Sequence, residues 1–99
     1  MQKLIEVWKA SAKGEGEART IHLVGDGEAP TAGYAAKLVL TNEGVRNDPE
    51  VAAVELQVTG PGDEDAQVVT AIQVEIEFRD PAVRIRIDTD WGEEWEDVR

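Results

Sequence analysis

The stretch that decides the fold class is IQVEIEFR, residues 72–79, in which apolar and polar side chains alternate at every step. Such alternation is typical of a half-buried β-strand, because successive side chains of a strand point to opposite faces of the sheet. Residues 83–88 alternate in the same way, and Asp80-Pro81-Ala82 lies between the two runs. Because the proline ring pre-sets a turn dihedral, the pattern predicts a β-hairpin over residues 72–87.

The predicted hairpin has one exposed and one buried face. Glu75 and Glu77 share the exposed face with Arg84 and Arg86, and opposite charges on neighbouring strands stabilise strand pairing. The other face is apolar and is predicted to be buried; it consists of Ile72, Val74, Ile76, Phe78, Val83, Ile85 and Ile87.

Shorter runs of the same kind lie upstream and are separated by glycine-containing turns. Strands are predicted over residues 4–12, 19–24, 36–41 and 54–59, with turns at Gly14-Glu15-Gly16, Gly25-Asp26-Gly27, Asn42-Glu43-Gly44 and residues 60–65. A length of 99 residues is that of one domain. We therefore predict an all-β fold, an antiparallel β-sandwich of about six to seven strands forming a single domain over residues 1–99.

Two segments allow other conformations. Asn47-Asp48-Pro49-Glu50 has the capping residue and early proline of a helix start, although the alternation from Val54 leaves room for only about one helical turn. The tail from Trp91 to Val98 fits either a helical turn or a last extended segment, and both remain open.

Composition limits the classes of function. Acidic residues outnumber basic ones by 21 to 10, for a formal net charge of −11, and cysteine is absent. The charge disfavours direct contact with nucleic acid or an anionic membrane, but it suits a basic protein partner or a cation. The lack of cysteine excludes disulfides and zinc–thiolate sites.

No run approaches the ~20 apolar residues of a membrane span, and residues 1–6 reach charge too early for a signal peptide. The oligomeric state stays open.

Catalytic side chains are scarce. The chain has one serine, Ser11, and one histidine, His22, and a Ser-His-acid triad needs both together. They fall on different predicted strands and outside any nucleophile motif. We therefore expect no catalytic residues and no enzymatic activity.

Calcium is the metal that the acidic residues suit best. Asp88 and Asp90 are two residues apart at a strand end, so they point to one side, and Glu93 follows closely. Calcium takes oxygen ligands from carboxylates and carbonyls, which makes these three residues a candidate site. A solvated acidic segment without a bound cofactor is the favoured alternative. Asp63 and Asp65 form a weaker second candidate.

The tryptophans provide a candidate partner-binding surface. Trp8 falls in the polar phase of its strand together with Glu6, so an outward ring could join Trp91 and Trp95 in an exposed patch beside Glu94 and Glu96. In the alternative, the tail folds over the sheet and the rings pack together. We predict a docked tail with Trp91 buried and Trp95 partly exposed, and we expect the domain to fold without residues 93–99.

The central stretch KLVLTNEG, residues 37–44, leads into VELQV, residues 54–58, and the chain closes with IRIDTD and the acidic residues 93–97. This succession resembles bacterial immunoglobulin-like modules of the CARDB type. The resemblance implies an immunoglobulin-like sandwich that acts as a spacer or binding module.

The regular alternation also fits a designed β scaffold. A third reading is an acidic protein that mimics nucleic acid and occupies a basic groove. A non-enzymatic binding or spacer module is the leading hypothesis.

Overall fold

The computed structural model describes residues 4–15, 19–29, 33–41, 50–60 and 69–99. These residues form seven strands: β1 (Ile5–Lys13), β2 (Thr20–Ala29), β3 (Ala35–Leu40), β4 (Val51–Thr59), β5 (Thr70–Arg79), β6 (Arg84–Thr89) and β7 (Gly92–Asp97). Within the described ranges no helix is present that could span a membrane. The helix start predicted at Asn47-Asp48-Pro49 lies outside these ranges, and β4 begins at Val51.

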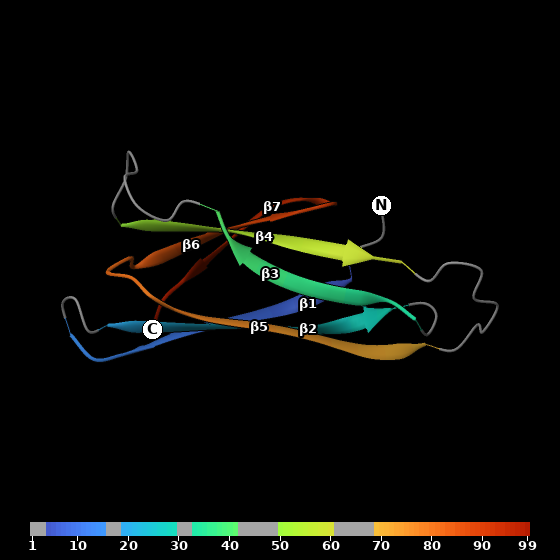
Figure 1. Ribbon diagram of the computed structural model, residues 1–99, viewed down its shortest axis with the longest axis horizontal. Helices are drawn as coiled ribbons and strands as arrows, with labels where there is room; N and C mark the ends of the chain where they lie inside the picture. Colours follow the sequence, from blue (N-terminus) through green and yellow to red (C-terminus); the bar gives the residue numbers. More distant parts are fainter. Residues whose placement is uncertain (1–3, 16–18, 30–32, 42–49, 61–68) are drawn as a thin grey trace.

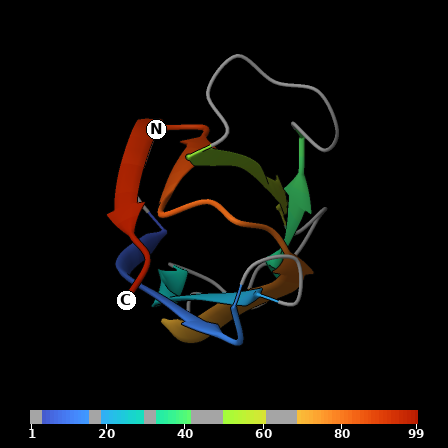
Figure 2. The same cartoon turned by 90° about the vertical axis from the view of Figure 1, so that its left-hand side faces the viewer.

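The strands form two packed sheets, which confirms the predicted all-β sandwich (Figures 1 and 2). Sheet A has the order β1-β2-β5 and sheet B the order β3-β4-β6-β7. Of the five pairs of neighbouring strands in these sheets, four are antiparallel, whereas β4 and β6 run parallel. Sheet B is therefore mixed rather than purely antiparallel, because the chain leaves it after β4, passes through β5 in sheet A and returns as β6.

The strand order differs from that of an immunoglobulin constant domain. In that arrangement the fourth strand joins the sheet of the first, second and fifth strands. Here β4 lies between β3 and β6 in the other sheet. The sandwich architecture is thus present with a different connectivity.

The predicted hairpin over residues 72–87 is wrong. Strand β5 pairs with β2, and β6 pairs with β4 and β7, so the two strands lie in different sheets. Asp80-Pro81-Ala82 belongs to the crossover: the Asp80 carboxylate accepts the Ala82 N–H at 2.9 Å, and the Asp80 N–H donates to the Arg19 carbonyl. Alternation defines which side of a strand is buried but not which strand it pairs with. The apolar sides of β5 and β6 therefore both face the core, but from opposite sheets.

The predicted turn at Gly25-Asp26-Gly27 is also wrong, because β2 continues through it to Ala29. Both glycines are close to β1. A Cβ on Gly25 would lie 2.5 Å from Trp8 Cζ3, and one on Gly27 would lie 1.8 Å from the Leu4 carbonyl oxygen. Glycine at these positions allows two strands to approach, a use of the residue that differs from turn formation.

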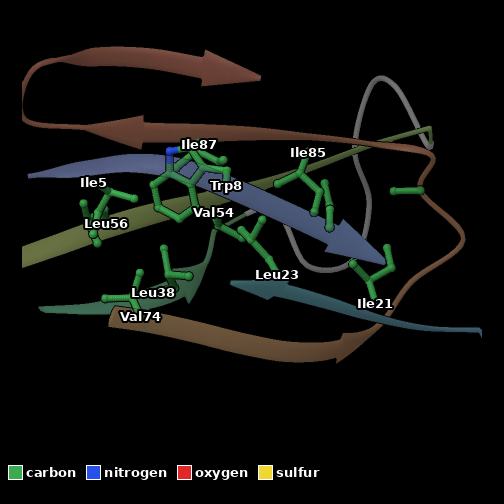
Figure 3. Packing of buried hydrophobic residues seen from close by; sticks show 13 residues of the cluster. Ile5, Trp8, Ile21, Leu23, Leu38, Val54, Leu56, Val74, Ile85 and Ile87 are labelled. Atoms are coloured by element: carbon green, nitrogen blue, oxygen red, sulfur yellow. The ribbon is translucent and has the colours of Figure 1, made fainter. Parts of the chain in front are cut away.

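The core lies between the sheets and is built from the inward residues of both. Figure 3 shows Trp8 projecting into the same cluster as Ile5, Val54 and Ile87. Of the predicted buried face, Ile85 and Ile87 are fully buried and Val74 nearly so, whereas Val83 is 48% exposed in the crossover. The buried members of the cluster are Ile5, Trp8, Ala10, Ile21, Leu23, Leu38, Ala52, Val54, Leu56, Val74, Ala82, Ile85 and Ile87.

The predicted outward position of Trp8 is wrong, and a β-bulge is the reason. Ile5 pairs with Gly27 but Val7 pairs with Asp26, so β1 has one residue more than β2 over this step. The extra residue reverses the alternation beyond it. Val7 is therefore 50% exposed, and Trp8 is only 8% exposed.

Candidate functional site

The tail residues form a strand, β7, rather than a helical turn. It pairs antiparallel with β6, from Thr89 opposite Gly92 to Arg84 opposite Asp97. Gly92 has φ = 129°, a conformation that side chains other than glycine rarely adopt, and this allows the short connection through Asp90 and Trp91. The Trp91 N–H also donates to Thr89 Oγ1 at 3.3 Å.

The alternation of β7 divides the predicted partner-binding residues between two faces. Glu94 and Glu96 are half-buried, whereas Glu93, Trp95 and Asp97 are exposed on the other side of the strand. The acids that share a face with Trp95 are therefore Glu93 and Asp97, and not the predicted Glu94 and Glu96.

On the inner face, Glu94 is bound by two tryptophans. Trp91 Nε1 donates to Glu94 Oε2 at 2.8 Å, and Trp8 Nε1 donates to the same oxygen at 3.4 Å. The Trp91 side chain is half-buried and packs against the core. This arrangement joins β1 of sheet A to β7 of sheet B, so it belongs to the interior of the fold and leaves these two rings out of any exposed aromatic patch.

On the outer face, Trp95 is 48% exposed. Its Nε1 donates to Glu93 Oε1 at 2.8 Å. The Arg84 guanidinium carbon lies 5.8 Å from the centre of the Trp95 ring, within the range of a cation–π interaction. Arg84 also lies 3.6 Å from the Asp97 carboxylate. The tail thus has one accessible ring, and charged groups surround it.

A row of acids crosses the same face beside Trp95. Glu55 of β4 is the register partner of Asp88 of β6, and Asp88 is the partner of Glu93 of β7. Arg86 Nε lies 3.3 Å from Asp88 and 4.0 Å from Glu93. Two of the three carboxylates, on Asp88 and Glu93, therefore share the Arg86 guanidinium, while Glu55 Oε1 accepts a hydrogen bond from Gln57 Nε2 at 2.8 Å. Like charges opposite one another otherwise destabilise a sheet. We call the outer surface made of Glu55, Arg84, Arg86, Asp88, Glu93, Trp95 and Asp97 the acid–tryptophan face.

The candidate calcium ligands are only partly brought together. Asp88 and Glu93 are register partners with Arg86 beside them, whereas Asp90 is exposed in the turn. Among the residues that the structure describes, no group of three or more acidic, histidine or cysteine side chains could hold a metal ion. Calcium binding stays a prediction from sequence. Asp63 and Asp65 lie outside the described ranges.

Ser11 and His22 are closer than their places in the sequence suggest. They are register partners on β1 and β2, so lying on different strands does not separate them. Both point outward from sheet A, where His22 Nε2 lies 2.9 Å from Glu75 Oε2. That ring nitrogen, which a catalytic triad directs at the serine, here contacts a carboxylate.

Sequence reasoning missed Glu55, Arg84, Arg86 and Asp97 as members of the acid–tryptophan face. The position of Asp97 could have been predicted from the sequence, because period-two alternation over residues 92–97 places it with Glu93 and Trp95 once the tail is treated as a strand. Arg84 and Arg86 depend on the antiparallel pairing of β6 with β7, which places them opposite Asp97 and Trp95. Glu55 required the parallel pairing of β4 with β6, for which the sequence has no local signal. Comparison with protein-family models, curated proteins and solved structures finds no match to this chain.

Proposed function

We propose that this chain is a non-enzymatic binding module whose acid–tryptophan face binds a basic segment of a protein partner. The observation that carries the proposal is the exposed ring of Trp95 next to the row formed by Glu55, Asp88 and Glu93. Exposed aromatic side chains are enriched where proteins bind one another.

The charges of this face favour a cationic partner. It has four carboxylates, on Glu55, Asp88, Glu93 and Asp97, and two guanidiniums, on Arg84 and Arg86. An arginine of a partner could donate two parallel hydrogen bonds to a carboxylate and stack on an aromatic ring. The chain's own arginines make related contacts here: a terminal nitrogen of Arg86 donates one hydrogen bond to Asp88 Oδ2 at 3.3 Å, and Arg84 lies over the Trp95 ring.

The other hypotheses have less support. A nucleic-acid mimic needs a continuous acidic surface, but Arg84 and Arg86 interrupt the acids of sheet B, and Lys9 and Lys13 line the outer side of β1 in sheet A. Ser-His-acid catalysis directs histidine Nε2 at the serine, whereas His22 Nε2 contacts Glu75 on the outer face of sheet A. A spacer or a designed scaffold needs no binding face, so a binding measurement separates both from the proposal.

Titration calorimetry with a hexa-arginine peptide tests the proposed function. We expect Trp95→Ala and the pair Glu55→Gln with Glu93→Gln each to weaken binding at least about tenfold, because they remove the stacking surface and two carboxylates.

The matched control is Glu6→Gln with Glu28→Gln, which removes the same charge from exposed positions of sheet A. We expect it to change binding less than about twofold at physiological salt. If the two double variants lose the same affinity for the peptide, net charge alone attracts it, and the proposal would be wrong. No binding by the unaltered chain would favour the spacer or scaffold reading.

A further inference from the structure

We infer that the outer face of sheet A is self-complementary and that a second copy of this chain binds it as a two-fold symmetric dimer. This surface lies on the opposite side of the sandwich from the acid–tryptophan face, so the inference does not depend on the proposed function.

In two rows of this face, positive and negative side chains lie on different edge strands. Lys9 of β1 pairs with Val24 of β2, and Val24 pairs with Glu75 of β5, so the three form one row across the sheet. The next row is Ser11, His22 and Glu77. In these two rows the lysine lies on one edge strand and both glutamates on the other, with Val24 and His22 between them.

These charges do not satisfy one another within the chain. Strand β2 separates Lys9 from Glu75 by two strand spacings, about 9–10 Å. Glu75 is instead 2.9 Å from His22. Lys9 and Glu77 form no ion pair with another residue in the described part of the chain. The face therefore presents a separated lysine and glutamate that only an external surface can bring together.

The same face turned about a two-fold axis supplies the required pattern. An axis in the interface plane, about 15° from the direction of β2, gives the crossing of about 30° that packed sheets adopt. Near the centre it places β5 of the second copy over β1 of the first. Lys9 of each copy then opposes Glu75 of the other, and Ser11 of each opposes Glu77 of the other. Val24 and His22, both on the central strand β2, each meet their own equivalents at the centre. Such an interface is isologous, the commonest kind in homodimers. An axis perpendicular to the strands would instead place β1 on β1, with like charges opposed.

The predicted contact is centred on these two rows. The two flanking rows do not match under this rotation: Lys13 would face Arg79 in the row of Thr20, and Asp26 would face its own equivalent in the row on the other side. Sheets that pack face to face cross at about 30°, so strand ends diverge away from the centre and such pairs separate.

The tail borders this surface along β1, where Glu96 and Arg99 line a groove and Arg99 exchanges backbone hydrogen bonds with Ala10 and Ala12; no described strand covers the face itself. Figure 2 shows sheet A as one outer layer, with its second face directed away from sheet B. A shallow groove of about 720 Å³ runs along β1, and Val7, Lys9, Ser11, His22 and Val24 are among its lining residues. Two exposed or half-exposed valines within a polar surround suit a weak, reversible contact better than a permanent one.

Sedimentation equilibrium of the full chain from ~10 µM to ~1 mM at physiological salt tests the inference, because dimers with dissociation constants in this range become visible there. Salt at this level screens the long-range repulsion between two chains of formal charge −11. We expect a monomer–dimer equilibrium that Lys9→Glu weakens at least about tenfold, since it replaces two attractive contacts by two repulsive ones. Lys37→Glu, which makes the same charge change on β3 of sheet B, should leave the equilibrium within about twofold of the unaltered chain.

The exchange Lys9→Glu with Glu75→Lys restores opposite charges across the proposed two-fold axis. We expect it to recover dimerisation to within about threefold of the unaltered chain. Lys9→Gln provides a second variant with milder charge loss, and circular dichroism confirms that each variant is folded. A chain that stays monomeric throughout, an equal effect of Lys9→Glu and Lys37→Glu, or no recovery in the exchanged pair would overturn the inference.

Discussion

Gly25 shows how a single residue without a side chain permits the core around Trp8. A Cβ at this position would lie 2.5 Å from Trp8 Cζ3 and 2.8 Å from Ile5 Cγ2, closer than real contacts allow. We expect Gly25→Ala to lower the free energy of unfolding by about 1–3 kcal/mol, the usual cost of overpacking. Urea denaturation measures the loss.

Gly60→Ala is the matched control for that substitution, because a Cβ there would lie 3.8 Å from Tyr34, an ordinary contact. We expect a change within about 0.5 kcal/mol. Combining Gly25→Ala with Trp8→Phe should recover part of the loss, since a smaller ring leaves more room. Equal stability of the two alanine variants would contradict the packing argument.

Glu94 is the residue on which the inner side of β7 depends. Its carboxylate accepts the indole N–H groups of Trp8 and Trp91. We expect Glu94→Ala to cost about 1–3 kcal/mol of stability, because it leaves part-buried donors without this acceptor. Glu96→Ala, at the other inward acid of the strand, should cost under about 0.5 kcal/mol. Thermal denaturation of both variants tests the difference; a larger loss at Glu96 would show that the indole contacts do not stabilise the strand.

At the scale of the elements, β6 tests how far alternation predicts burial. Val83 and Ile85 have the same phase in the sequence, but Val83 lies in the crossover and Ile85 is fully buried in the core. We expect Ile85→Ala to cost about 2–5 kcal/mol, as large-to-small core substitutions do. Val83→Ala should cost under about 1 kcal/mol. If both variants lose the same free energy of unfolding in chemical denaturation, Val83 is buried as deeply as Ile85, as the predicted hairpin face required.

The pairing of β5 can be tested directly, because the chain contains no cysteine. His22 and Glu77 are register partners on β2 and β5. Facing residues of antiparallel strands have Cα atoms about 4.5–5.5 Å apart, within disulfide range. We expect His22→Cys with Glu77→Cys to form a disulfide on mild oxidation, detected by mass spectrometry of unreduced peptides.

The comparison variant is Glu77→Cys with Arg84→Cys, a pair that the predicted hairpin would bring together. In the sandwich these residues belong to different sheets, which pack about 10 Å apart, so we expect no disulfide within one chain. Cross-linking in this second pair and not in the first would show that β5 and β6 form a hairpin after all.

At the scale of the whole molecule, the tail connects the two sheets. The Val98 N–H donates to the Val83 carbonyl of the crossover that precedes β6, and Arg99 exchanges backbone hydrogen bonds with Ala10 and Ala12 of β1. Figure 2 shows the end of the chain reaching β1 along one side of the sandwich. The tail therefore closes this side of the core, in contrast with the expectation from sequence that the domain folds without it.

Removing residues 92–99 should accordingly destabilise the entire sandwich. The deletion uncovers the edge of β6, where Ile85 and Ile87 are fully buried, and each such side chain contributes about 1.5–3 kcal/mol when it leaves water. We expect a loss of at least about 3 kcal/mol in urea denaturation followed by circular dichroism. A chain ending at Asp97 keeps β7 and should lose less. If the chain that lacks residues 92–99 has an unchanged urea denaturation midpoint, the tail does not stabilise the fold and serves binding alone.

Local pattern was enough to determine part of this protein. Period-two alternation depends only on neighbouring residues, and it correctly predicted an all-β sandwich and the burial of Val74, Ile85 and Ile87. Weighing the burial of the tail's tryptophans against the entropy of ordering it led to the prediction of a partly exposed Trp95, which is 48% exposed.

Only the tertiary structure decided which strands pair and where the charged groups meet. Pairing depends on contacts between residues far apart in the sequence, so alternation alone could not place β5 and β6 in different sheets. A single bulge residue turned Trp8 inward, and strand register placed Ser11 beside His22. The parallel alignment of β4 with β6 completed the acid row by placing Glu55 next to Asp88. Each of these features arises from register, which is set by the packing of the whole sandwich and has no signature in any one segment.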